Sequence, residues 1–115
     1  MSAETGINLI NGFFIGTSNT TMFTSSTEAL LTTIDYARLM NVDANSVSIT
    51  IWVLQPGDVL ADNFKALPAL VLARDQHYSL DEIIGTSLSG GGTIVAVASK
   101  ANSVAMSLTG TLRFI

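Results

Sequence analysis

Residues 104–114 read VAMSLTGTLRF, in which every even position is apolar or glycine and the odd positions hold alanine, serine, threonine and arginine. Alternation with a period of two places successive side chains on opposite faces of an extended chain. The pattern recurs in residues 47–54, VSITIWVL, and in residues 93–97, TIVAV. The three segments therefore predict an antiparallel sheet with one face in a core and the other in solvent.

Shorter β-prone runs between turn-forming residues complete the predicted fold. We expect an all-β antiparallel sandwich, either jelly-roll or immunoglobulin-like, with seven or eight short strands. At most one short helix is expected, between Leu60 and Leu67, because Pro68 ends any helical turn there. The apolar parity changes near Asp35, which predicts a bulge at that point. The additional expected strands are Thr20–Thr24, Leu30–Met40, Ala69–Ala73 and Tyr78–Ile84.

Turn residues separate these runs. Residues 41–46, NVDANS, predict a turn that joins two strands as a hairpin, because Asn and Asp side chains bond to their own backbone. Lys100–Asn102 is expected to be the turn of a last hairpin. Asn41, Asp43 and Asn45 also have the spacing found at the start of a calcium-binding loop. The glycine and the glutamate that such a loop needs are missing, so a turn and a weak cation site are the two interpretations that remain.

The chain divides into residues 1–19, an expected N-terminal arm or edge strand, and residues 20–115, the expected sandwich domain. Phe13 and Phe14 lie in the first segment between glycines. Two adjacent aromatic residues there would be a liability in a monomer and an anchor in an assembly. We therefore expect them to take part in protein contacts.

Composition narrows the class of partner. Charged residues make up 12% of the 115-residue chain, 25 positions are Ser or Thr, and 48% are hydrophobic with a mean hydropathy of +0.48. This apolar excess predicts burial in a homo-oligomer or a larger assembly. The net charge is −4 and the five basic residues are scattered, so no nucleic-acid partner is expected. No membrane partner or signal peptide is expected either, because the longest apolar runs have five residues and the first residues carry no basic region.

Catalytic and metal motifs are incomplete. The chain has no cysteine and one histidine, His77. Gly85–Gly92 lacks the lysine that a phosphate-binding loop requires. It also lacks the glycine that a nucleophile elbow has two residues after its serine. Asp81 and Glu82 would point to opposite faces of a strand and could not flank one bond. We therefore expect no enzyme activity, no metal and no cofactor.

Aromatic residues are the remaining interaction candidates. Trp52 shares its parity with Ser48 and Thr50, so we expect it to be exposed on a hydroxyl-rich face. Burial in an interface, a second layer of core, and carbohydrate contact together with Tyr36 and Tyr78 are three interpretations that remain open for it.

Several stretches together resemble a family of small β-sandwich proteins of tailed-phage virions. In that family a strand ending in Asn leads to a hydrophobic hairpin, and a Gly-Asp-Thr-Ile type entry precedes an Ala/Ser-rich hairpin ending in Ser-Gly. Ser26 stands where a proline is common, and Gly92 where an aspartate is common. The matching stretches are residues 21–24, 34–41 running into 47–53, 78–81, and 91–99 followed by 101–110.

The resemblance implies a virion component, either a capsid decoration protein or part of the tail, and no catalytic residues to carry over. The implied partners are other virion proteins, the major capsid or a tail protein, with a trimer as the first expectation for the homo-oligomer. The implied location is the virion, assembled in the host cytoplasm. A carbohydrate-binding module at a fibre tip is the alternative.

Overall fold

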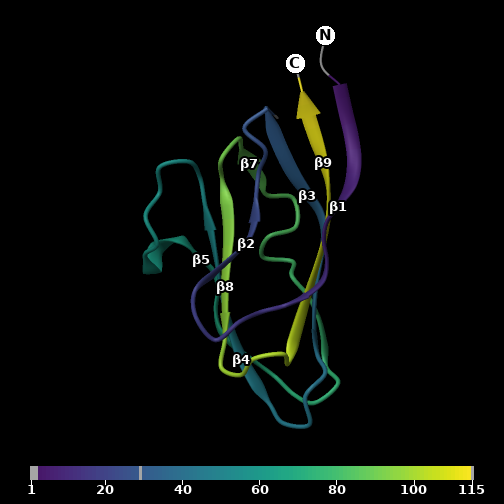
Figure 1. Cartoon of the computed structure of the whole chain (residues 1–115), viewed down its shortest axis with the longest axis vertical. Coiled ribbons are helices and arrows are strands. Elements are labelled where there is room, and N and C mark those ends of the chain that lie inside the picture. Colours follow the sequence, from purple (N-terminus) through teal and green to yellow (C-terminus); the bar gives the residue numbers. More distant parts are fainter. Residues whose placement is uncertain (1–2, 29, 115) are drawn as a thin grey trace.

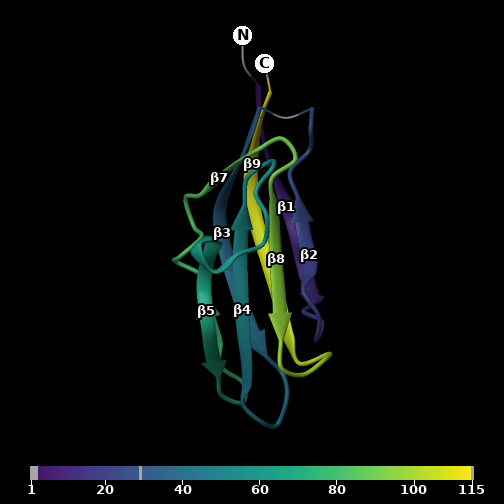
Figure 2. The ribbon, with the colours of Figure 1, turned by 90° about the vertical axis from the view of Figure 1, so that its left-hand side faces the viewer.

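The computed structural model describes residues 3–28 and 30–114. These residues form two antiparallel sheets packed face to face (Figures 1 and 2), with nine strands and one 3-10 helix among them. The elements are β1 Ala3–Phe14, β2 Thr20–Thr24, β3 Leu31–Asn41, β4 Val47–Leu54, η1 Asp62–Phe64, β5 Lys65–Leu72, β6 His77–Ser79, β7 Ser87–Ser89, β8 Thr93–Ala98 and β9 Val104–Phe114.

The strand order identifies the architecture. One sheet has the order β1-β9-β3-β6, with β7 also paired to β3, and the other has the order β2-β8-β4-β5. Two four-stranded paths interleaved in this way, with most consecutive strands in opposite sheets, constitute a jelly roll. The expected all-β antiparallel sandwich is confirmed, and of the two expected topologies the structure has the jelly roll. It has nine strands in the described residues where seven or eight were expected.

Both expected hairpins are wrong. The turn after Asn41 joins β3 to β4, and the turn around Lys100–Asn102 joins β8 to β9, but in each case the two strands belong to different sheets. Alternation reports which face of a strand is buried and does not report its neighbour. Each turn is therefore a crossing between the two sheets.

The core lies between the sheets and follows the predicted parity. Ile49 and Ile51 on β4 and Met106 and Leu108 on β9 are each at most 1% exposed. These side chains form one cluster with apolar residues from the other strands and from the turn that follows β6. Burial of this cluster is the main stabilising contribution to the sandwich.

The region from residue 60 to residue 84 differs from the prediction in two places. A helical turn is present but is confined to η1, and β5 then runs through Pro68, which was expected to end the segment. Pro68 is tolerated because β5 is an edge strand with a register shift between Leu67 and Leu70. The described residues include no helix long and apolar enough to cross a membrane.

The expected strand Tyr78–Ile84 ends at Ser79. Leu80 and Ile83 are fully buried in a turn in which the Ile83 amide donates to the Leu80 carbonyl oxygen at 3.0 Å. Their apolar character reflects a turn packed on the core, not a strand.

Two bulges flank β9 at the same level. On β3, Ile34 and Tyr36 pair with Gly110 and Thr109, so Asp35 is the extra residue, as the parity change predicts. On β1, Asn8 and Ile10 pair with Thr109 and Leu108, which leaves Leu9 as the extra residue. β9, which lies between β1 and β3, thus has a bulged strand on each side.

Candidate functional site on the outer face of the five-stranded sheet

The outer face of the five-stranded sheet is built mainly from small polar side chains. Its floor is the odd-numbered side of β9, because Val104, Met106 and Leu108 on the even side are fully buried. The strand register places residues of β1 and β3 beside most of the odd-numbered positions of β9. Three rows across the face are Gly6, Thr111 and Thr33; Asn8, Thr109 and Tyr36; and Phe14, Ala105 and Met40. Ser107 has Arg38 of β3 as its neighbour.

Two hollows on this face share Asp35 as a lining residue. Their volumes are about 420 and 310 Å³. The larger is also lined by Gly6, Asn8, Thr109 and Gly110, and the smaller by Leu31, Thr33, Ser87, Thr111 and Arg113. We call the pair the Asp35 hollow.

The sequence explains both the space and the polarity of the Asp35 hollow. Gly6 contributes no side chain where its row partner is Thr111, and a Cβ placed there would meet nothing closer than the Gly110 carbonyl oxygen at 3.9 Å. The bulge on β3 leaves both Asp35 and Tyr36 exposed. The Thr111 hydroxyl donates a hydrogen bond of 2.6 Å to Asp35 Oδ2, which fixes the carboxylate on the face.

Phe13 and Phe14 lie at the far end of β1 and are 64% and 47% exposed. A second register shift in β1, between Ile10 and Phe13, precedes them. Gly12 supplies the φ of +67° that this shift requires, and its amide donates to the Ser107 hydroxyl oxygen at 3.1 Å. This register shift changes the direction of the strand, so that two adjacent aromatic side chains reach the surface.

The two tyrosines have different environments. Tyr36 is 48% exposed beside the Asp35 hollow. Tyr78, on β6, is half-buried and packs against the core. Its hydroxyl donates to Glu82 Oε2 at 2.5 Å, and this hydrogen bond, with smaller contributions from burial and from the nearby carboxylates, raises the pKa of Tyr78 to about 12.

Trp52 is not exposed as expected, since only 8% of it is accessible. Its parity was predicted correctly, because it lies opposite the main core, in a second cluster with Leu54 and Val95 against which Phe64 and Val97 pack. Lys65 Nζ lies 6.0 Å from the ring centroid. This arrangement corresponds to the second-core-layer interpretation.

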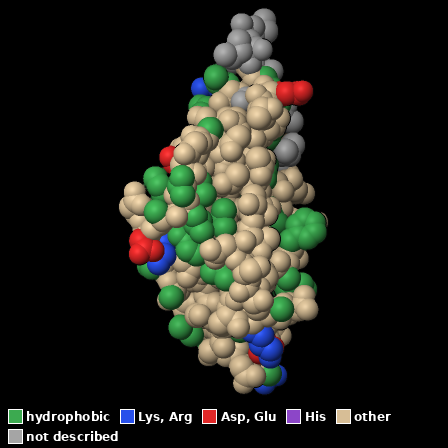
Figure 3. All heavy atoms as spheres, turned by 60° about the vertical axis from the view of Figure 1, so that its left-hand side comes forward, with side chains coloured by type: hydrophobic (Ala, Val, Ile, Leu, Met, Phe, Trp, Pro, Cys, Tyr) green, Lys and Arg blue, Asp and Glu red, His purple; other side chains and the backbone are tan. Residues whose placement is uncertain are grey.

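The segment between β4 and β5 folds back over this second cluster, and Figure 3 shows hydrophobic side chains gathered on that face of the molecule. Of the predicted aromatic candidates, Phe14 and Tyr36 lie on the outer face of the five-stranded sheet. Trp52 and Tyr78 do not lie on that face.

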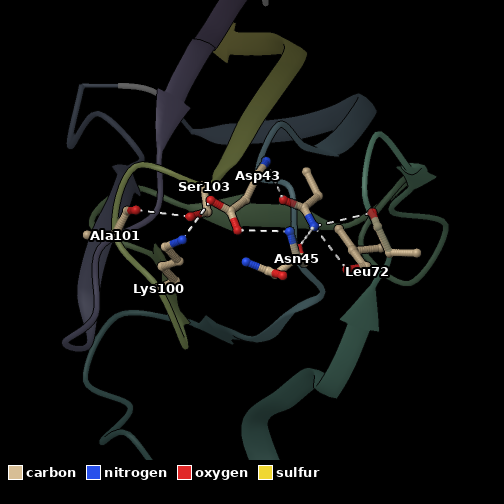
Figure 4. A network of polar contacts seen from close by, with 8 residues as sticks. Asp43, Asn45, Leu72, Lys100, Ala101 and Ser103 are labelled. Carbon is tan, nitrogen blue, oxygen red and sulfur yellow. Dashed lines mark hydrogen bonds and ion pairs between the residues drawn. The ribbon is translucent and has the colours of Figure 1, made fainter.

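A polar network holds together the β3–β4 turn, the end of β5 and the β8–β9 turn at one end of the sandwich (Figure 4). The buried Asn41 side-chain nitrogen donates to the carbonyl oxygens of Asn45, Leu72 and Ala73 at 2.9, 3.0 and 3.2 Å. Asp43 bonds Lys100 Nζ at 2.8 Å, and this contact, followed by the hydrogen bond from the Asn45 amide, lowers the pKa of Asp43.

The residues that were compared with a calcium loop therefore make a turn. Within the described part of the chain, no three or more His, Asp or Glu side chains come together as they would to hold a metal ion. His77 lies exposed at the start of β6.

Sequence reasoning located the Asp35 bulge but did not identify Asp35 or Gly6 as site residues. The parity change was the only signal for Asp35. The position of Gly6 in the row of Thr111 and Thr33 depends on the pairing of β1 with β9, which alternation does not specify.

Neither a protein-family model nor a curated protein sequence matches the chain. Solved structures do match in fold. A chain of the Bacillus endospore appendages, described as disulfide-linked pili, aligns with 12% identity and a TM-score of 0.50 over 99% of this chain and 86% of that one.

Two infectious bursal disease virus chains align over the same region of this chain. The Gx strain structure has 11% identity and a TM-score of 0.59, over 99% of this chain and 33% of the viral one. The T13 viral particle has 8% identity and a TM-score of 0.57, over 98% and 31%. The chain therefore spans about a third of the viral chains, and these likenesses establish the sandwich fold.

Proposed function

We propose that the protein is a non-enzymatic structural component of a bacteriophage virion, assembled in the host cytoplasm, and specifically a decoration protein that binds the assembled capsid as a homo-oligomer. The observation that carries the proposal is the exposed Phe13–Phe14 pair at the bulged end of the edge strand β1. A tail or fibre component is the alternative.

The exposed pair favours a protein partner on energetic grounds. Apolar surface removed from water stabilises association by roughly 25 cal/mol per Å², and aromatic side chains are enriched at interface centres. The pair stands at the sheet edge, where a partner can reach it without disturbing the core.

Two further observations support the proposal. Jelly-roll domains recur in viral capsids, and the fold is shared with viral and pilus chains. Fold alone does not determine function, so the phage assignment rests on the resemblance of the strand and turn stretches. The glycan-binding form of the alternative loses support at Trp52 and Tyr78, because the first is covered and the second is bonded to Glu82.

The oligomer is tested by sedimentation velocity on the full chain and on a Phe13→Ser/Phe14→Ser double variant. We expect the native chain to form a closed homo-oligomer, with a trimer as the first expectation, and the double variant to sediment as a folded monomer with the native far-ultraviolet circular dichroism spectrum. Val71→Ser is the matched control, because Val71 is 61% exposed on the edge strand of the other sheet. A native chain that stays monomeric at high concentration contradicts the oligomer.

The location is tested by immunogold electron microscopy of virions from the phage that encodes the chain. Label over the capsid supports a decoration protein, and label over the tail supports the alternative. Particles without label contradict both.

A further inference from the structure

The Asp35 hollow offers hydrogen-bond donors and acceptors of mixed kinds within one small area. Asp35 supplies carboxylate acceptors, and Asn8 supplies an amide that both donates and accepts. Hydroxyl groups of Thr109, Thr33, Ser87 and Thr111 surround them. The Thr109 hydroxyl can donate or accept, whereas Thr111 already donates to Asp35 and one of Thr33 and Ser87 already donates to the other. A ligand that complements this lining must itself donate and accept at adjacent positions.

Charge narrows the class of ligand further. The described residues that line it include one acidic side chain, Asp35, and one basic side chain, Arg113. A strongly anionic ligand would meet the carboxylate, and a strongly cationic one would meet the guanidinium. A neutral molecule rich in hydroxyl groups avoids both repulsions and satisfies both hydrogen-bonding roles.

An aromatic residue, Tyr36, neighbours these polar groups in the sheet. Tyr36 follows Asp35 directly, and the bulge leaves both side chains exposed, with Tyr36 in the row of Asn8 and Thr109. An amphipathic ring next to hydrogen-bonding groups suits a ligand that has an apolar face and a polar rim. Pyranose sugars have this shape.

The site is also held in place before any ligand arrives. The Thr111 hydroxyl bonds the Asp35 carboxylate at 2.6 Å, and the hydroxyls of Thr33 and Ser87 lie 2.9 Å apart. Both contacts link neighbouring strands of a sheet, which limits the ordering cost of binding. From these observations we propose that the Asp35 hollow binds a neutral saccharide, with Asp35 and Asn8 on its hydroxyl groups and Tyr36 against its ring. This inference does not depend on the proposed virion function.

The test is an amide NMR titration of the full chain with glucose, galactose, mannose and N-acetylglucosamine and with disaccharides built from them. We expect at least one of these sugars to shift amide signals around Gly6, Asn8, Tyr36 and Thr109. Asp35→Asn should weaken that binding about tenfold, because a charged acceptor becomes a neutral one. Failure of every sugar to shift these signals, or shifts confined to the surroundings of Trp52 or Tyr78, overturns the proposal.

Gly6→Val provides a steric test that leaves the fold intact. The Gly6 backbone is compatible with a side chain, and an added Cβ meets only the Gly110 carbonyl oxygen at 3.9 Å, so a valine there takes up space in the hollow. We expect it to abolish saccharide binding while the melting temperature is maintained. Binding that persists in Gly6→Val places the sugar elsewhere and contradicts the proposal.

Two controls separate this site from other effects. Asp62→Asn removes a carboxylate on η1, on the other side of the molecule, and should leave the affinity unchanged. The Phe13→Ser/Phe14→Ser variant should bind the sugar with native affinity even where it no longer forms an oligomer. A loss of sugar binding in Asp62→Asn contradicts a site at Asp35.

Discussion

Leu9 occupies the space that a side chain at Gly110 would need. A Cβ on Gly110 would lie 2.7 Å from Leu9 Cδ1 and would collide with the Thr33 carbonyl oxygen on the opposite neighbour. Leu9 is the extra residue of the β1 bulge, and Asp35 is the extra residue of the β3 bulge at the same level. The glycine therefore permits the close approach of three strands that exposes Asp35 on one face and packs Leu9 on the core at the other.

Gly110→Ala should destabilise the protein by about 1–3 kcal/mol, because overpacking forces the β3 backbone or Leu9 to move. The free energy of unfolding, measured by urea denaturation, checks this. Gly6→Ala is the matched control on the neighbouring strand, where a Cβ has room, and it should be neutral or stabilise by up to about 1 kcal/mol. Equal effects at the two glycines would contradict the packing described for Leu9.

A charged side chain should destabilise the protein strongly on the inner face of β9 and only mildly on its outer face. Leu108→Asp places an unpaired carboxylate in a fully buried position and should cost more than the whole stability of roughly 5–15 kcal/mol. Ser107→Asp should be mild, because Ser107 faces outward and the new carboxylate can still accept from the Gly12 amide. Circular dichroism melts distinguish an unfolded variant from a folded one, and similar melts for the two variants would show that the register is wrong.

Parity alone placed most strands and their buried faces. Residues 47–54 and 104–114 form β4 and β9 with the expected bounds, and Ile51 and Leu108 point inward. Parity could not assign strand neighbours, because a five-residue turn fits either a hairpin or a crossing between sheets. The jelly-roll order therefore depends on long-range packing that no local pattern records.

The site was less predictable than the fold. Trp52 was placed on the correct face, but its cover comes from Phe64, twelve residues later, in a segment without regular periodicity. The Asp35 hollow requires β1, β9 and β3 to be adjacent, so residues from positions 6 to 113 meet there. The exposure of Phe13 and Phe14 at the end of β1 agrees with their place between glycines, and their contact with a partner stays a prediction.

Asn41→Leu should weaken the loop end of the sandwich. The buried amide satisfies the Leu72 carbonyl oxygen and accepts from the Asp43 amide at 2.9 Å, and leucine leaves these groups without that partner. Each unsatisfied buried group costs about 1–3 kcal/mol. Urea denaturation should report a loss in that range or above it, while Asn63→Ala, at an exposed position of η1, should change the stability little. A native-like Asn41→Leu variant would show that the network does not hold the loops.

Tyr78 and Glu82 should be coupled at alkaline pH. In a Tyr36→Phe background Tyr78 is the only tyrosine, so its ionisation can be followed by ultraviolet absorbance. We expect a pKa of about 12, because the hydrogen bond to Glu82 stabilises the neutral phenol. A pKa raised on folding stabilises the protein below the unfolded-state value of about 10, and this contribution is lost as the pH rises through about 12.

Glu82→Gln should move the Tyr78 pKa toward 10, and Glu28→Gln, at an exposed position outside this contact, should not. Ionisation near 10 in the chain that retains Glu82 would show that the hydrogen bond does not persist in solution.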